Sequence, residues 1–529
     1  MKPVNHPAGG DLASARLDVR LVPAALTSWT VTAAGIVWPV GRVVAALCVV
    51  LAAAAGMLLW RAERWTPRIR AVSVGLMAIG VVGAGFGFAI ALRADAARHH
   101  PITAAFGTAA RVTVTPTESA LSVGGSRIMF RATLQRLGAH EISGRVVVFA
   151  RALEFSKVMV GQPMEFGARI TRPTRHDLTI AVLNATGETT VGRAGPVSRA
   201  AHAVRERFAT AAREVLPAQQ AAMLPALVLG DTSTVTAVTS REFRAAGLTH
   251  LTAVSGANVT IVCGAVLFSA RLVGPRAAVA LAAVALVVFV VIVQPTASVL
   301  RAAVMGAIAL LGVLSSRRRQ AIPALAATVL VLMAVAPQLA VDVGFALSVV
   351  ATAALVVIAP VWSRRMVAHG WPKPLADALA IAWAAQVVTA PLVAGISGRV
   401  SLVAAAANMA VAAMIAPITV LGSAAAALCV LWPAGAHLLI RFTGPELWWV
   451  LSAAHWSAGV PAATVPVPAG LPGVVVVGAA AVLIVVLWRW RWFRAVMAIA
   501  MVCLLSWSLS GLLAGQGAAV SAARDTIVG

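Results

Sequence analysis

Long apolar runs, repeated along most of the chain, are the feature that most limits what this sequence can fold into. A helix that crosses a bilayer needs about 20 mostly apolar residues. Such runs lie at 22–38, 43–60 and 71–92, and the chain is again strongly apolar from 217 to 513. Only 11% of the 529 residues are charged, against roughly 25% in an ordinary soluble domain. This pattern excludes a soluble protein and predicts a polytopic α-helical membrane protein with about 11–13 spans.

The segment 93–198 interrupts the apolar pattern with short runs that are rich in β-forming residues. Between 164 and 170, apolar residues alternate with polar or small ones, which is typical of a half-buried strand. Similar runs lie at 111–115, 128–134, 145–150 and 178–183. Five or six strands in about 90 residues predict a small β-barrel or sandwich, for which an OB-type barrel is one candidate.

The predicted organisation follows from these changes of character. We expect N-terminal transmembrane helices at 1–92, an OB-like β-domain at 93–198, an amphipathic helix at 199–216, a multi-span domain at 217–513 and a short tail at 514–529. Apolar side chains line one face of the 199–216 helix. That helix is therefore expected either to lie on the membrane surface or to pack on the β-domain.

Basic loops predict the orientation, because cytoplasmic loops carry an excess of Arg and Lys. The loops expected in the cytoplasm are Arg61–Arg70, Arg271 with Arg276, Arg317–Arg319, Arg364 with Arg365, and Arg489–Arg494. This places the N-terminus of an inner-membrane protein in the cytoplasm, with the β-domain and the C-terminus outside. The alternation also requires an extra crossing between 399 and 470. Either 401–431 breaks near Pro417 into two spans, or 434–457 also crosses.

Several functional classes are excluded by missing motifs. The sequence contains no G-x-x-x-x-G-K-[ST], H-E-x-x-H or G-x-S-x-G, so no nucleotide-binding loop or hydrolase signature can be read. All four cysteines lie in apolar runs far apart in the chain, which gives no thiolate metal site. We therefore expect no enzyme, no cofactor and no metal. The net charge of +24 reflects basic cytoplasmic loops, an anionic cargo, or both.

Polar interruptions of the apolar region carry the functional information, because a bilayer tolerates polar groups only where protein or water satisfies them. The stretch Phe243–Asn258 reads F-R-A-A-G-L-T-H-L-T-A-V-S-G-A-N. It resembles the signature of the ComEC family of competence proteins. Similar elements follow in family order at Pro295–Ala302, Asp342–Ser348, Gln386–Pro391, and Gly398–Leu402 with Asn408. Two departures are Ala257-Asn258, where many members have Leu-His, and Ala346, where many have Gln.

The resemblance implies an inner-membrane channel that takes up single-stranded DNA during natural transformation. It also implies partners: membrane lipid, a cytoplasmic helicase-like motor, an outer DNA receptor and a separate nuclease. Long family members carry a C-terminal metallo-β-lactamase-like domain, whose zinc site needs clustered His and carboxylate ligands. No H-x-H-x-D-H set occurs in this sequence, so the form expected here lacks that domain.

Two groups of residues are predicted to meet the DNA. The candidate path or motif residues are Asp231, Glu242, Arg244, His250, Ser255, Asn258, Arg301, Asp342, Gln386 and Asn408. The candidate outer-domain contacts are Arg169, Arg172, Arg175 and His176, on a segment that carries net positive charge. That charge also suits a solvated surface beside anionic lipid.

Some of these residues have alternative roles. Arg301 begins an otherwise apolar helix, so it is expected in the bundle interior, where it would meet phosphates, or snorkelling outward. Asp342 either pairs with Arg301 or caps the following helix, and Asp231 also suits a turn or a cap. Glu242 and Arg244 line a polar vestibule or lie in a surface loop. Gln386 and Asn408 are expected to hydrogen-bond across helices.

Two other functions remain open at this point. A basic interior also suits a transporter of another anionic solute, and a truncated, inactive relative would act as a scaffold.

Overall fold

The computed structural model describes residues 18–38, 40–61, 67–124, 126–155, 159–252, 254–294, 296–314, 321–487, 490–492, 495–496 and 499. The predicted tail at 514–529, Arg317–Arg319 and nearly all of the predicted span at 495–513 lie outside these ranges, as does part of Trp488–Arg494. The chain divides into two compact units, one made of Met1–Glu206 and Ser255–Val349, the other of Arg207–Val254 and Val350–Gly529.

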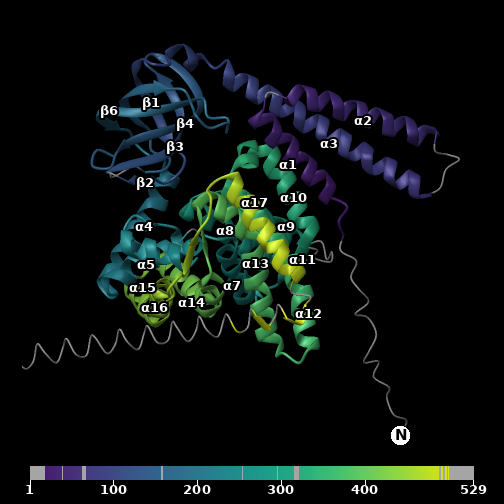
Figure 1. The fold of residues 1–529 in the computed structure, drawn as a ribbon. Coiled ribbons are helices and arrows are strands. Elements are labelled where there is room, and N and C mark those ends of the chain that lie inside the picture. The colour runs from purple at the N-terminus through teal and green to yellow at the C-terminus, as the bar shows by residue number, and fades with distance from the viewer. Residues whose placement is uncertain are drawn as a thin grey trace, which may run out of the picture. The chain divides into compact units, whose positions relative to one another are not determined.

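The first unit contains two groups of membrane helices. The elements are α1 (Val22–Val37), α2 (Gly41–Arg61), α3 (Pro67–Arg98), α7 (Gly256–Ala270), α8 (Pro275–Val293), α9 (Ala297–Leu314), α10 (Ala321–Val335), the 3₁₀ turn η4 (Pro337–Val341) and the start of α11 (Val343–Val357). Helices α2 and α3 run side by side (Figure 1). Glycine permits this close approach, because a Cβ at Gly80 would lie 2.7 Å from the backbone N of Ala52.

A closed β-barrel lies between these two groups in the sequence. Its strands are β1 (Ala109–Pro116), β2 (Leu121–Gly124), β3 (Arg127–Leu137), β4 (His140–Arg151), β5 (Met164–Thr171) and β6 (Ala181–Val191). The order is β1-β5-β6-β4-β3, β1 closes on β3, and β2 adds to β3. All pairings are antiparallel except β4 with β6. The predicted small barrel is confirmed.

One strand begins later than the sequence pattern predicts. Strand β6 starts at Ala181 rather than Leu178, because Leu178 adopts a φ of 65°, which a strand residue cannot have.

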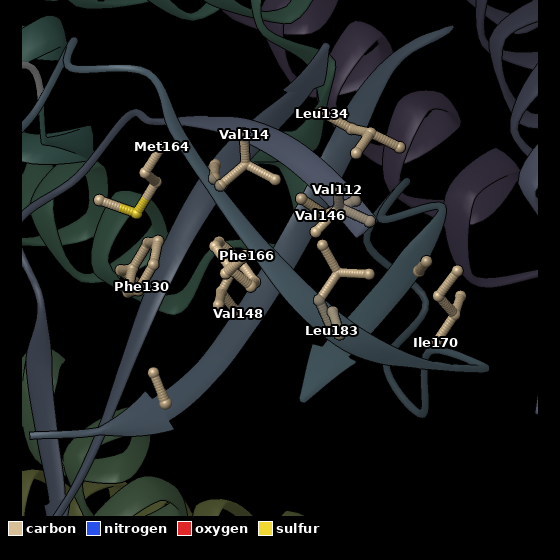
Figure 2. Close-up of a cluster of buried hydrophobic side chains, with 14 of the residues drawn as sticks. Val112, Val114, Phe130, Leu134, Val146, Val148, Met164, Phe166, Ile170 and Leu183 are labelled. Carbon is tan, nitrogen blue, oxygen red and sulfur yellow. The ribbon is translucent and has the colours of Figure 1, made fainter. Parts of the chain in front are cut away.

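Alternate side chains of the strands fill the barrel. Figure 2 shows Phe130, Val148 and Phe166 among the apolar side chains between the strands, and each is at most 1% exposed. Phe155, in the loop after β4, meets the Phe166 ring edge-on with centroids 5.3 Å apart. The period-two alternation of the sequence thus produces an apolar core, which holds the outward-facing residues in fixed positions.

Where the structure describes it, the second unit is helical apart from one short strand pair. Its elements are α5 (Ala218–Leu229), α6 (Ala237–Ala245), the 3₁₀ turn η3 (Thr249–Leu251), α12 (Ala359–Ala368), α13 (Lys373–Ser397), β7 (Arg399–Ser401), α14 (Ala404–Leu431), α15 (Pro433–Phe442), α16 (Gly444–Gly459), β8 (Thr464–Pro466) and α17 (Leu471–Leu487). Helix α14 continues through Pro417, so the predicted break there is wrong. The 434–457 segment forms α15 and α16, which meet at the fully buried Thr443.

The predicted amphipathic helix is α4 (Pro196–Val215). Arg205 of α4 is 7% exposed and donates hydrogen bonds to the carbonyls of Ile292 and Val293, at 3.1 and 3.4 Å. A cation is favourable at this position, because the carboxyl end of α8 carries partial negative charge. At Arg205, α4 therefore packs on a membrane helix, a partner that neither predicted alternative named.

Six helices of the described ranges are long and apolar enough to cross a membrane. They comprise Gly41–Arg61, Pro67–Ala105, Pro275–Val293, Val343–Ala368, Lys373–Ser397 and Ala404–Leu431. Further apolar helices of 10–17 residues accompany them. The protein is therefore a multi-pass membrane protein, and the count of about 11–13 crossings stays a prediction.

Candidate functional site

Arg301 is a buried cation in the first unit. It lies in the second turn of α9 and is 6% exposed. Its Nε donates to Ser348 Oγ at 2.6 Å, and Nη1 contacts Met305 Sδ at 3.2 Å. Within the described ranges no carboxylate forms an ion pair with this guanidinium. The side chain therefore lies inside the unit rather than snorkelling outward, with its charge uncompensated by an acid.

The N-terminus of α7 lies against Arg301. A Cβ at Gly256 would be 2.8 Å from Arg301 Nη2, so a larger residue here would displace the guanidinium from its present position. Ser255 is the N-cap, and its Oγ donates to Asn258 Oδ1 at 3.2 Å. Asn258 is 4% exposed. A helix N-terminus carries partial positive charge and free N–H groups, so helix and guanidinium together favour an anion here.

Asp342 meets the barrel rather than Arg301. Its Oδ1 accepts a hydrogen bond from the Phe345 N–H at 2.8 Å, so it caps α11 as one predicted alternative held. Its Oδ2 lies 3.9 Å from Arg131 Nη2 on β3. Nearby, Ser119 Oγ donates to Gln294 Oε1 at 2.6 Å. Two polar contacts therefore join the barrel to the ends of membrane helices in its own unit.

Charges at this joint shift the pKa values of two arginines in opposite directions. Burial lowers the pKa of Arg131, but the negative charges of Glu118 and Asp342 raise it by more, so the pKa is raised overall. The Glu118 carboxylate accepts hydrogen bonds from Arg131 Nη1 at 3.0 and 3.1 Å. The pKa of Arg145 is lowered, by burial and by the charge of Arg131. Arg145 Nη1 is buried and has no hydrogen-bond partner among the described residues. Where the barrel meets α11, the carboxylates of Glu118 and Asp342 thus partly offset the positive charges of Arg131 and Arg145.

The first turns of α11 connect the joint to Arg301. Asp342 contacts Arg131 and Ser348 contacts Arg301. Six residues of α-helix separate these two contacts, which corresponds to about 9 Å of rise. The element that resembles the family's D-x-G-F-x-L-S sequence therefore touches both arginines.

Two of the family-like stretches meet in the second unit. Gly247 has a φ of 71°, and a Cβ there would lie 2.4 Å from Ala404 Cβ. Ser401 Oγ donates to the Ala245 carbonyl at 2.7 Å. The end of α6 thus packs on the start of α14 and on β7. Sequence segments about 150 residues apart come together by this close backbone contact.

Four other predicted path residues of the second unit lie on α6 or in the turns beside it. Glu242 Oε1 lies 2.8 Å from His455 Nδ1 of α16. Arg244 and His250 are exposed. Asp231 accepts hydrogen bonds from the N–H and hydroxyl of Ser233 in a turn after α5, as predicted for a turn residue.

Of the two mid-helix amides, Asn408 differs from expectation, and the hydrogen bond expected from Gln386 stays a prediction. Asn408 Nδ2 donates to the Ala404 carbonyl of its own helix at 2.8 Å, so the expected hydrogen bond across helices is wrong for Asn408. A side chain in the second turn of α14 can reach the carbonyl four residues back, which satisfies the amide locally. Gln386 lies half-buried in α13.

The four predicted outer-domain cations are all exposed, on β5 and in the loop that follows. Arg172 lies over the Phe106 ring at 5.7 Å. Sequence reasoning missed a second basic site on the barrel wall, where Arg127, Phe149 and Arg151 line a pocket with Leu153 and Asn184. The available signal was the alternation of Phe149 and Arg151 with buried residues, which puts both on the outer face.

A comparison with known protein families matches about half of the chain. The family model described as "Competence protein" matches residues 227–492. No curated protein and no solved structure matches the chain.

Proposed function

Because this chain belongs to the competence protein family, whose name implies a role in DNA uptake, we propose that it forms a path for single-stranded DNA across the inner membrane. The observation that carries the proposal is the buried guanidinium of Arg301, which lies at the N-terminus of α7 and lacks an acidic partner among the described residues. Burying an uncompensated cation raises the free energy of the folded protein unless an anion binds beside it.

A DNA phosphate fits the chemistry of this position. Guanidinium groups bind phosphate through several N–H donors at once, and helix N-termini add further N–H groups. Phosphates recur at every nucleotide and carry no base identity, so such contacts support passage of any sequence. In this proposal the phosphates of the moving strand contact Arg301, Ser255 and Asn258 in turn. None of these residues is catalytic.

The barrel receives the strand on the outer side of the membrane, and the N-terminus faces the cytoplasm. A five-stranded Greek-key barrel of OB type is a common scaffold for single-stranded nucleic acid, and the closed strand order supports that assignment. Motor force, capture of external DNA and cleavage of the other strand fall to separate partners: a helicase-like protein, an outer receptor and a nuclease.

Deleting the gene in a naturally transformable host tests this function. We expect loss of transformants and of internalised, nuclease-resistant labelled DNA, with full recovery when the gene returns on a plasmid. DNA bound at the cell surface should stay unchanged, because the receptor is another protein. Undiminished internalisation in the deletion strain would refute the channel and leave the scaffold or another anionic cargo.

Gly256→Ala should reduce uptake about tenfold, since displacing a hydrogen bond of a charged group costs about 1.5–3 kcal/mol. The new methyl group would lie 2.8 Å from Arg301 Nη2 and push the guanidinium away from Ser348.

The matched control is Gly264→Ala on the same helix, where a Cβ meets nothing within 4 Å. Its uptake should equal that of the wild type at equal protein abundance. Equal losses in the two variants would mean that α7 itself, rather than Arg301, is sensitive.

A further inference from the structure

We propose that the pocket on the barrel wall binds one nucleotide unit of single-stranded DNA, with its base on Phe149 and its phosphate between Arg127 and Arg151. This rests on the proposed function only in taking the ligand to be a nucleic-acid strand. All the residues that line this pocket belong to the β-barrel domain. It encloses about 550 Å³, within the range of roughly 300–1,000 Å³ that is typical of small-ligand sites.

Two arginines directly oppose each other at one end of the pocket. Arg127 and Arg151 are register partners in the antiparallel β3–β4 pair. Two like charges on directly opposite residues of a sheet destabilise it. A bound anion between Arg127 and Arg151 would relieve this repulsion, so the pair suits an anion site. Arg151 also lies 3.5 Å from Glu154, but the two side chains are 80% and 39% exposed, and water weakens that contact. Both guanidinium groups can therefore turn to a phosphate.

An aromatic ring and an uncovered apolar side chain lie beside the arginines. Phe149 is half-buried, and the Arg127 guanidinium carbon lies 5.7 Å from its ring centroid. Leu153, at the rim of the pocket, is 89% exposed. A flat heterocycle would cover both side chains and stack on the ring, as bases do on aromatic platforms in single-strand binding proteins. A free phosphate would leave the two apolar groups uncovered.

The strand register continues the site across the barrel. Phe149 of β4 pairs with Asn184 of β6, and Asn184 pairs with Arg169 of β5. These three residues form a row over three adjacent strands, and all point outward because their neighbours face the core. The row supplies the Phe149 ring, the Asn184 amide and, after Arg127 and Arg151, a third cation at Arg169. A strand held at Arg127 and Arg151 thus passes over Phe149 toward Arg169, one of the contacts expected from the sequence.

Fluorescence anisotropy of a labelled oligothymidylate with the full-length protein in detergent micelles tests the pocket. The double variant Arg127→Gln with Arg151→Gln should weaken binding at least about tenfold. It should also lower the slope of log affinity against log salt by about 1.4, since each phosphate contact on single strands contributes about 0.7. Phe149→Leu should weaken binding about tenfold with no change in slope, because it removes stacking alone.

The matched control is Arg111→Gln with Arg136→Gln, which removes the same charge from exposed positions on β1 and β3 outside the pocket. It should change affinity less than threefold. Equal weakening by the control and the pocket pair would overturn the proposal, as would wild-type affinity in the Phe149→Leu variant.

Two further arms separate this proposal from neighbouring ones. Binding of phosphatidylglycerol vesicles that depends on the same residues, without oligothymidylate binding, would identify a lipid site instead and overturn it. A pocket that binds oligothymidylate as described, in a protein whose deletion leaves uptake intact, would uphold the pocket and refute the channel. Loss of uptake on deletion, with no effect of pocket substitutions on binding, would support the channel and refute the pocket.

Discussion

Arg301→Glu is expected to reduce DNA uptake at least about 100-fold while leaving membrane insertion intact, since reversing one partner of a desolvated charge contact costs several kcal/mol. The substitution places a carboxylate where the proposal puts a passing phosphate, and like charges repel strongly in a site of low polarity. The N-terminus of α7 lies beside this position and tolerates a negative charge. The protein should therefore still fold and insert.

The series around this variant separates charge from geometry. Arg301→Lys keeps the charge but loses the planar fork that contacts Ser348 and Met305, so we expect partial uptake. Arg276→Glu makes the same charge change at an exposed position at the start of α8, and uptake should stay within about threefold of wild type. Membrane abundance is measured by immunoblot of each strain. Normal uptake by normally inserted Arg301→Glu would refute the place of Arg301 in the path.

Phe166→Ala is expected to destabilise the barrel by about 3–5 kcal/mol, the usual cost of removing a buried aromatic ring. Phe166 is 1% exposed and packs against Phe155, and Figure 2 shows it at the centre of the core. A small closed barrel has few other side chains that can move into the space. Because a domain of this size is stabilised by about 5–15 kcal/mol, the loss should expose much of it to proteases.

Limited trypsin digestion of the full-length protein in detergent measures this effect through cleavage between 109 and 191. Leu121→Ala is the control, since Leu121 on β2 is 53% exposed and its truncation leaves no cavity. The control should match the wild-type cleavage rate. A Phe166→Ala protein as resistant as the wild type would mean that the barrel is stabilised mainly from outside its own core.

Local periodicity explains which parts of the fold could be predicted from the sequence. The apolar runs gave α2 and α3, and the alternation between Met164 and Ile170 gave β5, because both patterns are set by neighbouring residues. The wrong prediction of a helix break at Pro417 also came from a local pattern. Proline disfavours a helix locally, but helices in membranes tolerate it where other groups satisfy the freed carbonyl, and α14 continues through it.

Contacts between distant segments could not be predicted in this way. Asp342 has an obvious local role as a helix cap, and nothing in its neighbourhood indicates Arg131, about 210 residues earlier. The hydrogen bond from Ser119 to Gln294 is of the same kind. The motifs identified the segment around Arg301, but that Ser348 and Gly256 surround its guanidinium follows only from how α7, α9 and α11 pack.

The two barrel contacts also impose a rule of parity on the chain. Gln294 follows α8 and Asp342 precedes α11, and both touch the same barrel. The polypeptide that leaves the membrane face at the first residue must return to that face at the second. We therefore expect α9 and α10, which lie in this interval, to contribute an even number of crossings. A measured topology with an odd number of crossings between 294 and 342 would contradict this expectation.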